Sequence, residues 1–148
     1  MAPRYENPKL MTDAVCFWGD RILLVRRGRP PFRGMWALPG GFVEMQETVE
    51  EAAARELHEE TGIRARPWRL VGVYSGPHRD PRGSSASVAF LLRGRWTRPR
   101  GADDAAEAAW VSLRDARPLA FDHERIVRDA RRLWAKLHRR HRGARASG

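Results

Sequence analysis

The sequence predicts a single α/β domain, and three observations lead to this prediction. Short apolar runs bounded by glycine, proline and polar residues are typical of strands. Residues 48–61 contain no glycine or proline and are dense in alanine, glutamate and leucine, which favours a helix. From His123 onward, apolar residues recur at three- and four-residue spacing, which places an apolar stripe on a second helix. A chain of 148 residues is long enough to bury one core.

The expected strands are distributed along the whole chain. The apolar runs 14–18 and 22–25 are separated by Gly19 and Asp20, a pair typical of a hairpin turn, so we expect these runs to pair antiparallel. A loop rich in glycine and proline follows, with one short strand at 36–38. The helix at 48–61 is expected to end at Gly62. Further strands are expected at 69–74, 86–92 and 108–111.

The formal net charge of +10 is concentrated near the C-terminus. No acidic residue follows Asp129, whereas seven lysine and arginine side chains do. We expect one domain over residues 1–148, with a basic tail that is solvated and frays from about residue 139. Although basic tails can bind polyanions, we do not expect a nucleic-acid partner, because the rest of the chain is only mildly basic.

The cysteine content and the lack of long apolar runs indicate in which cellular compartment the protein is expected. The lone Cys16 cannot form an intramolecular disulfide, and the first ten residues lack the apolar stretch of a secretory signal. No apolar run approaches the roughly 18–20 residues that span a bilayer. We therefore expect a cytoplasmic protein with no membrane partner.

Acidic residues cluster in and before the expected first helix. Seven of the eighteen carboxylates fall within seventeen consecutive positions, namely Glu44, Glu47, Glu50, Glu51, Glu56, Glu59 and Glu60. A solvated helix face accounts for Glu50 and Glu51, since Glu51 can pair with Arg55 one turn later.

Three of these acids lie on the side of the helix that should face inward. Glu56, Glu59 and Glu60 share a sector with small and apolar residues, and they occupy the last turns, where the helix dipole disfavours negative charge. A hard divalent cation such as Mg²⁺ would resolve this conflict, because it prefers carboxylate oxygens. The structural alternative is a buried ion-pair network built on Arg55.

The stretch from Gly41 to Ile63, GFVEMQETVEEAAARELHEETGI, resembles the Nudix box, G-x5-E-x7-R-E-U-x-E-E-x-G-U, where U is aliphatic. Every defined position matches. The resemblance implies a Nudix-type α/β/α sandwich with a mixed β-sheet. It also implies an enzyme that uses a divalent cation, Mg²⁺ or alternatively Mn²⁺, to hydrolyse a nucleoside diphosphate linked to another moiety.

The resemblance also implies roles for individual residues. Glu56, Glu59 and Glu60, together with the carbonyl oxygen of Gly41, would bind metal. Arg55 would support the chemistry by bracing the catalytic loop with Glu47. Glu56 or Glu59 would act as the general base, and the resemblance does not decide between them.

The family often takes a further acidic ligand from outside the box. Asp104 stands at about the right place before Trp110. Asp103 and Glu107 are the less favoured alternatives. We therefore expect Asp104 to contribute to the metal site.

The segment at 78–83, HRDPRG, resembles that of Nudix members similar to ADP-ribose pyrophosphatases. This resemblance implies hydrolysis of ADP-ribose to AMP and ribose 5-phosphate. Arg79 and Arg82 would contact the substrate, since guanidinium groups match phosphate and ribose oxygens. The alternative is that one of them pairs with Asp80 to hold the turn. Ser84 stands where relatives often have histidine, which weakens the case for strict ADP-ribose selectivity.

Other functions compatible with the same resemblance remain open at this stage. The substrate could be a nucleoside triphosphate or another nucleotide sugar. The chain could also be a sensor of Nudix fold that binds ADP-ribose without hydrolysing it, although the complete set of carboxylates in the box argues against this. Because dimers are common in the ADP-ribose branch of the family, we expect a homodimer.

Overall fold

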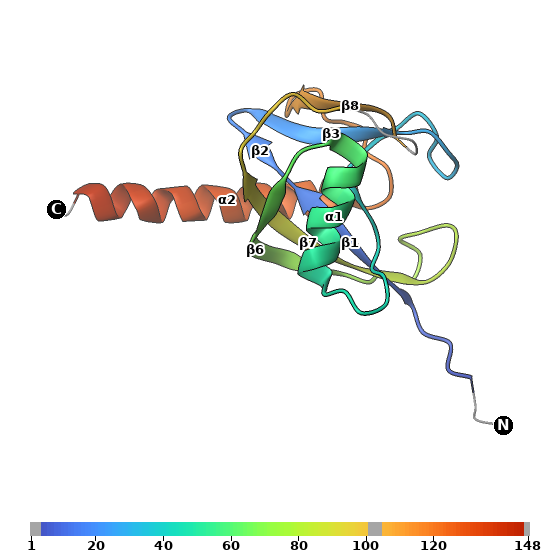
Figure 1. The fold of residues 1–148 in the computed structure, drawn as a ribbon. Helices are drawn as coiled ribbons and strands as arrows, with labels where there is room; N and C mark the ends of the chain where they lie inside the picture. Colours follow the sequence, from blue (N-terminus) through green and yellow to red (C-terminus); the bar gives the residue numbers. More distant parts are fainter. Residues whose placement is uncertain (1–3, 101–104, 147–148) are drawn as a thin grey trace.

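The computed structural model describes residues 4–100 and 105–146, and eight strands and two helices lie within these ranges (Figure 1). In chain order they are β1 (Lys9–Val15), β2 (Phe17–Trp18), β3 (Arg21–Arg27), β4 (Trp36–Ala37), β5 (Gly40–Phe42), α1 (Val49–Thr61), β6 (Ala65–Tyr74), β7 (Ser85–Gly94), β8 (Ala105–Ser112) and α2 (His123–Ala146). Each helix and strand expected from the sequence has a counterpart in this list.

The strands form two sheets. The first has the order β5-β1-β7-β6, in which β1 and β7 are parallel and the other neighbours are antiparallel, so this sheet is mixed as expected. In the second sheet β3 pairs antiparallel with β2, β4 and β8. β1 leads directly into β2, and this connection joins the two sheets.

The two helices cover opposite faces of the first sheet. Ala14 and Phe90 pack in one buried cluster with Leu57 of α1. Their chain neighbours, Val15 and Leu91, pack in another cluster with Ile126 of α2. Successive residues of a strand point to opposite faces, so the sheet lies between the helices. The α/β/α sandwich is therefore confirmed, and α2 extends beyond the body (Figure 1).

The expected pairing of residues 14–18 with 22–25 is correct only at one end. Phe17 and Trp18 pair with β3, but Ala14 and Val15 belong to β1 and pair with β7. The chain passes from one sheet to the other at the buried Cys16. An apolar run shows that a segment is buried, but it does not show which strand lies beside it.

The segment expected to be a loop contains the additional strand β5. Its residues pair antiparallel with residues 11–13 of β1. A Cβ at Gly40 would collide with the backbone of Thr12, so glycine is required for this close approach. The pairing places the residues that begin the Nudix-like motif at an edge of the first sheet.

Both ends of α1 agree with the sequence prediction. The Thr48 hydroxyl accepts a hydrogen bond from the Glu51 N–H at 3.0 Å, and Gly62 ends the helix in the left-handed conformation. α2 extends to Ala146, so residues after about 139, which we expected to fray, are helical. Within the described ranges, neither helix is long and apolar enough to cross a membrane.

Candidate active site

The inward-facing carboxylates of α1 meet the short strand β5. The Glu60 carboxylate accepts a hydrogen bond from the Gly40 N–H at 2.9 Å. The Glu56 carboxylate lies so close to Gly41 that a Cβ there would come within 2.6–2.9 Å of its atoms. The fold therefore brings Glu56, Glu60 and the backbone of Gly41 together, as the sequence predicts.

Burial raises the pKa of both inward-facing carboxyls. Desolvation raises the pKa of Glu60 to about 9, and repulsion from Glu56 and Asp13 adds to the shift, while the Gly40 hydrogen bond opposes it. Desolvation also raises the pKa of Glu56, although Arg55 offsets part of this effect. Neighbouring carboxyls with disfavoured ionised forms are typical of functional sites.

Glu59 is placed differently from the other two acids. Its side chain is 56% exposed, and its carboxylate contacts the Arg55 guanidinium at 3.2 Å. The structure thus separates Glu59, toward solvent, from Glu56 and Glu60, toward β5. This position leaves the Glu59 carboxylate accessible to water and to a substrate.

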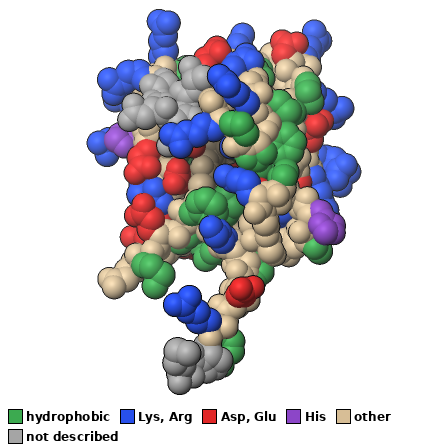
Figure 2. All heavy atoms as spheres, turned by 90° about the vertical axis from the view of Figure 1, so that its right-hand side faces the viewer, with side chains coloured by type: hydrophobic (Ala, Val, Ile, Leu, Met, Phe, Trp, Pro, Cys, Tyr) green, Lys and Arg blue, Asp and Glu red, His purple; other side chains and the backbone are tan. Residues whose placement is uncertain are grey.

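The carboxylate oxygens of Glu56 and Glu60 are ligands that suit a hard divalent cation. Such a cation would reduce the repulsion between the two carboxylates. Figure 2 shows acidic side chains gathered in one area of a face over which lysine and arginine are otherwise scattered. Within residues 4–100 and 105–146, no three His, Cys, Asp or Glu side chains form a cluster that could hold an ion by themselves. Mg²⁺ does not require such a cluster, since it commonly uses one or two carboxylates plus substrate phosphates.

Arg55 connects the helix to the loop that precedes it. Its guanidinium donates to both carboxylate oxygens of Glu47, at 2.7 and 3.0 Å, and to the Phe42 carbonyl oxygen at 3.0 Å. It also donates to Glu56 at 2.9 Å. The hydrogen bond from Arg55 lowers the pKa of Glu47 to about 2. These contacts link Glu47 to Arg55 as expected. They also form the ion-pair network on Arg55 that the sequence left open as the alternative to a metal site.

Arg82 has a partner but remains accessible. Its guanidinium donates to both carboxylate oxygens of Asp80, at 2.9 and 3.1 Å, while its side chain is 42% exposed. The guanidinium also lies 5.7 Å from the Phe42 ring centroid and 5.6 Å from that of Phe121. Asp80, Arg82 and Phe42 line a cavity of about 790 Å³ beside β5. Arg82 is therefore near the box and available to a ligand.

Arg79 differs from Arg82, because its side chain is only 4% exposed. It donates to both carboxylate oxygens of Asp122, at 2.7 and 2.9 Å, and to the Ser85 hydroxyl at 2.9 Å. All three guanidinium nitrogens thus have partners within the protein. The geometry favours a positioning role for Arg79, which ties its loop to the start of α2, over the substrate contact expected from the sequence.

A buried Asp13–His123 pair beside Glu60 was not predicted. The His123 Nε2 lies 3.3 Å from an Asp13 carboxylate oxygen, and its Nδ1 accepts from the Leu38 N–H at 3.0 Å. Burial raises the pKa of Asp13, but contacts with His123, Ser87 and Arg79 outweigh this effect and lower it. These residues hold the backbone just before β5. Asp13 lies inside an apolar run and His123 is distant along the chain, so no spacing pattern connects them.

Of the three acidic residues considered as a further metal ligand outside the box, the structure describes only Glu107. Asp103 and Asp104 lie outside the described residues. Glu107 lies on β8, its side chain is 53% exposed, and its carboxylate pairs with Arg26 at 3.1 Å. The structure therefore gives no support for Glu107 as a ligand, and Asp104 remains a prediction.

Comparisons with known proteins agree with this geometry. The sequence model of the NUDIX domain family matches residues 9–130 of this chain. The chain belongs to the Nudix family. An ADP-ribose pyrophosphatase from Methanocaldococcus jannaschii is 46% identical over 125 residues, which make up 84% of this Nudix chain and 74% of that protein.

One further Nudix relative is named as a transcriptional repressor, and another was solved in complex with ADP ribose. The ADPR responsive transcriptional repressor NtrR of Acinetobacter baylyi is 33% identical over 135 residues, which span 85% of this chain but only 54% of the repressor. The NUDIX domain of Shewanella oneidensis NrtR, solved with ADP ribose, has a TM-score of 0.80 and 31% identity, with 88% of this chain and 90% of that domain covered. Nudix hydrolases are generally dependent on divalent metals, in agreement with the chemistry of the Glu56–Glu60 site.

Proposed function

We propose that this Nudix protein hydrolyses ADP-ribose to AMP and ribose 5-phosphate in a reaction that depends on Mg²⁺. The main observation in support of metal-dependent hydrolysis is that the carboxylates of Glu56 and Glu60 lie against the backbone of Gly40 and Gly41. The substrate assignment is supported by the 46% identity to the pyrophosphatase of M. jannaschii over most of both chains.

Within this proposal, Glu56, Glu60 and the Gly41 carbonyl oxygen hold the cation, and Glu59 and Asp104 are additional candidate ligands. When bound, the cation offsets charge on the diphosphate and lowers the pKa of a water molecule. Glu59 or Glu56 accepts the proton of the attacking water. Arg55 keeps Glu56 and the loop in position through its hydrogen bonds.

Arg82 is the better of the two candidate substrate contacts. Its exposed guanidinium lies beside the cavity near β5 and can donate to phosphate or ribose oxygens. Arg79 is buried and holds the same loop in place through its hydrogen bonds to Asp122 and Ser85. We further propose a homodimer that works in the reducing cytoplasm, where the buried thiol of Cys16 would persist.

A sensor that binds ADP-ribose without turnover is the second candidate, because one similar protein is named as an ADPR responsive transcriptional repressor. The complete set of acids in the box favours hydrolysis over this alternative. Both the hydrolase and the sensor would bind ADP-ribose, but only the hydrolase would form AMP and ribose 5-phosphate. Analysis of the products therefore distinguishes them.

Incubation with ADP-ribose and Mg²⁺, followed by chromatography, tests the proposal. AMP and ribose 5-phosphate should appear together, and both should be absent in EDTA or with the Glu59→Gln, Glu60→Gln double variant. The Glu50→Gln, Glu51→Gln double variant is the matched control, because both residues are exposed on the same helix.

The possible negative results have different meanings. Intact ADP-ribose beside a cleaved nucleoside triphosphate or nucleotide sugar would contradict the substrate and retain Nudix hydrolysis. Tight binding of ADP-ribose, measured by calorimetry, with no cleavage of any diphosphate would favour the sensor.

A further inference from the structure

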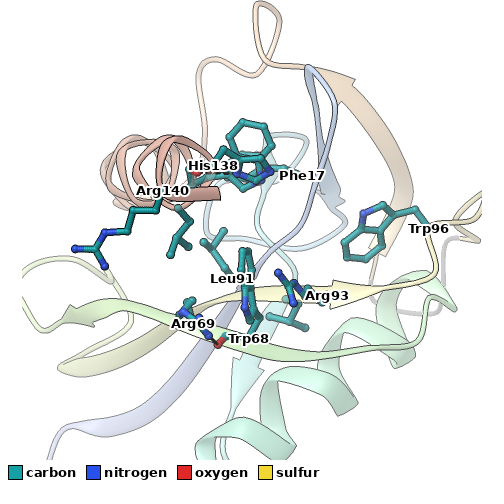
Figure 3. A pocket seen from close by; sticks show the side chains of 11 residues that line it. Phe17, Trp68, Arg69, Leu91, Arg93, Trp96, His138 and Arg140 are labelled. Carbon is teal, nitrogen blue, oxygen red and sulfur yellow. Dashed lines mark hydrogen bonds between the residues drawn. The ribbon is translucent and has the colours of Figure 1, made fainter. Parts of the chain in front are cut away.

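A second cavity lies between α2 and strands β6 and β7 (Figure 3). Its volume is about 610 Å³, and its lining includes three tryptophans, Trp68, Trp96 and Trp134, and three arginines, Arg69, Arg93 and Arg140. None of the described residues that line it is acidic. The cavity therefore combines aromatic surface with positive charge, which suits a ligand that joins planar rings to anionic groups.

Two stacked pairs lie on opposite sides of this cavity. On the sheet side, the Arg93 guanidinium lies 3.5 Å from the centroid of the Trp68 ring. On the α2 side, the His138 and Trp134 rings are stacked with centroids 3.7 Å apart. Figure 3 shows Trp68 and Arg93 on the side of the sheet and His138 beside the helix. Guanidinium planes and aromatic rings are the surfaces on which unpaired nucleic-acid bases stack.

α2 carries two further exposed basic residues, Lys136 and Arg139, which are chain neighbours of the lining residues Leu137, His138 and Arg140. Arg140 extends from the helix at one side of the cavity (Figure 3), and no acidic residue follows Asp129 in the chain. α2 itself extends past the rest of the molecule (Figure 1). Several positive charges in and beside one cavity suit a chain of phosphates better than a single nucleotide.

The cavity is separate from the hydrolytic site. Glu56 and Glu60 lie on α1, which covers one face of the first sheet, whereas α2 covers the other. The cavity-lining residues Phe17, Leu91 and Trp134 pack on the α2 side, whereas Leu92 and Trp96 pack in the α1-side cluster. None of the described lining residues belongs to the Nudix box. A ligand in this cavity would therefore not occupy the place of the diphosphate.

We propose that this cavity binds single-stranded nucleic acid, with bases on the Arg93–Trp68 and His138–Trp134 pairs and phosphates beside Arg69 and Arg140. This proposal revises our expectation that nucleic acid is not a partner. From the sequence, the arginines belong to a solvated tail, but the fold places Arg140 beside tryptophans and two arginines of the sheet. Double-stranded nucleic acid should bind more weakly, since its bases are not free to stack.

Fluorescence anisotropy with a short fluorescein-labelled oligothymidylate tests this proposal. EDTA is present so that the metal-dependent site does not contribute. The Arg93→Glu, Arg140→Glu double variant should weaken binding about tenfold or more. The matched control is the Arg131→Glu, Arg132→Glu double variant, which changes the net charge by the same amount. Both residues are exposed on α2 and line a different depression. This control should weaken binding less than about threefold. ADP-ribose hydrolysis should be unchanged in both variants, which also confirms that they fold.

The Arg93→Lys variant separates stacking from charge. It keeps the positive charge but loses the planar guanidinium, so the affinity should still fall several-fold. The proposal would be overturned if the oligonucleotide does not bind at low salt, if the Arg131 and Arg132 variant loses as much affinity as the cavity variant, or if duplex DNA binds as tightly. Displacement of the probe by AMP at the same nucleotide concentration would also overturn it, because it would assign the cavity to a mononucleotide.

Discussion

At the residue scale, this Nudix protein holds two carboxyls where their ionised forms are disfavoured. Glu60 is buried against the Gly40 N–H, and Glu56 lies against Gly41 and Arg55. Folding removes these groups from water at a cost to stability, and a bound divalent cation would offset this cost. This arrangement supports the proposal that Glu56 and Glu60 bind a cation.

The pKa of Glu60 predicts a pH dependence of stability in EDTA. The folded protein keeps Glu60 protonated up to about pH 9, whereas the unfolded chain loses this proton near the ordinary value of 4.5. The folded state binds more protons between these values, so this carboxyl makes the free energy of unfolding fall as the pH rises through that range. Glu60→Gln should flatten the fall in urea unfolding curves. Exposed Glu59→Gln is the control, and equal pH profiles for wild type and Glu60→Gln would contradict the prediction.

Arg55 offers a second prediction at this scale. Arg55→Lys keeps the charge but cannot donate simultaneously to Glu47, Glu56 and the Phe42 carbonyl oxygen. We expect kcat for ADP-ribose to fall roughly ten- to a hundredfold, with little change in KM. Steady-state kinetics measures this, and exposed Arg64→Lys should retain wild-type values. A raised KM with normal kcat would instead place Arg55 at the substrate.

At the scale of elements, the site depends on the close approach of β5 to α1. β5 is held by its pairing with β1, and α1 by its capped ends and by Leu57, which is fully buried. Neither element carries the site alone. The glycines of β5 provide the room that the α1 carboxylates occupy.

Gly41→Ala tests this approach. The added Cβ would come within 2.6–2.9 Å of the Glu56 carboxylate, which must then move. We expect Mn²⁺ affinity, followed by electron paramagnetic resonance, to fall roughly ten- to a hundredfold with the fold retained. Gly76→Ala is the matched control, since a Cβ there meets nothing within 4 Å. Unchanged Mn²⁺ affinity in Gly41→Ala would remove Gly41 and Glu56 from the proposed metal site.

At the scale of the whole molecule, the mixed sheet lies between the proposed hydrolytic site and the cavity proposed to bind nucleic acid. α1 and the hydrolytic site lie on one face, and α2 with the tryptophan- and arginine-lined cavity lies on the other. The Tyr74 hydroxyl, which donates to Asp129 at 2.7 Å, helps to hold α2 on the sheet. Changes on the α2 face should therefore affect stability or nucleic-acid binding more than hydrolysis.

Ile126→Ala tests this separation. Ile126 is fully buried between α2 and the sheet, so the cavity left by the substitution should lower the free energy of unfolding by about 2–5 kcal/mol in urea titrations. The folded protein should keep its kcat for ADP-ribose. Exposed Lys136→Ala should change neither quantity. A large loss of kcat in folded Ile126→Ala would show that the two faces are coupled.

The sequence by itself determined the features that depend on local order. The ends of α1 follow from Thr48 and Gly62, and the motif between Gly41 and Ile63 identifies the family and the chemistry of the carboxylates. Helix propensity, capping and motif spacing are properties of neighbouring residues, so they can be recognised without a structure.

Only the tertiary structure decided which distant residues meet. β5 pairs with β1, and residues 14–18 are divided between two sheets. Arg79 pairs with Asp122, and Asp13 lies beside His123. The tertiary structure also brought α2 over Trp68 and Arg93 to form the second cavity. The physical reason is that pairing and burial depend on side chains far apart along the chain, and several partners satisfy the same local pattern until packing selects one.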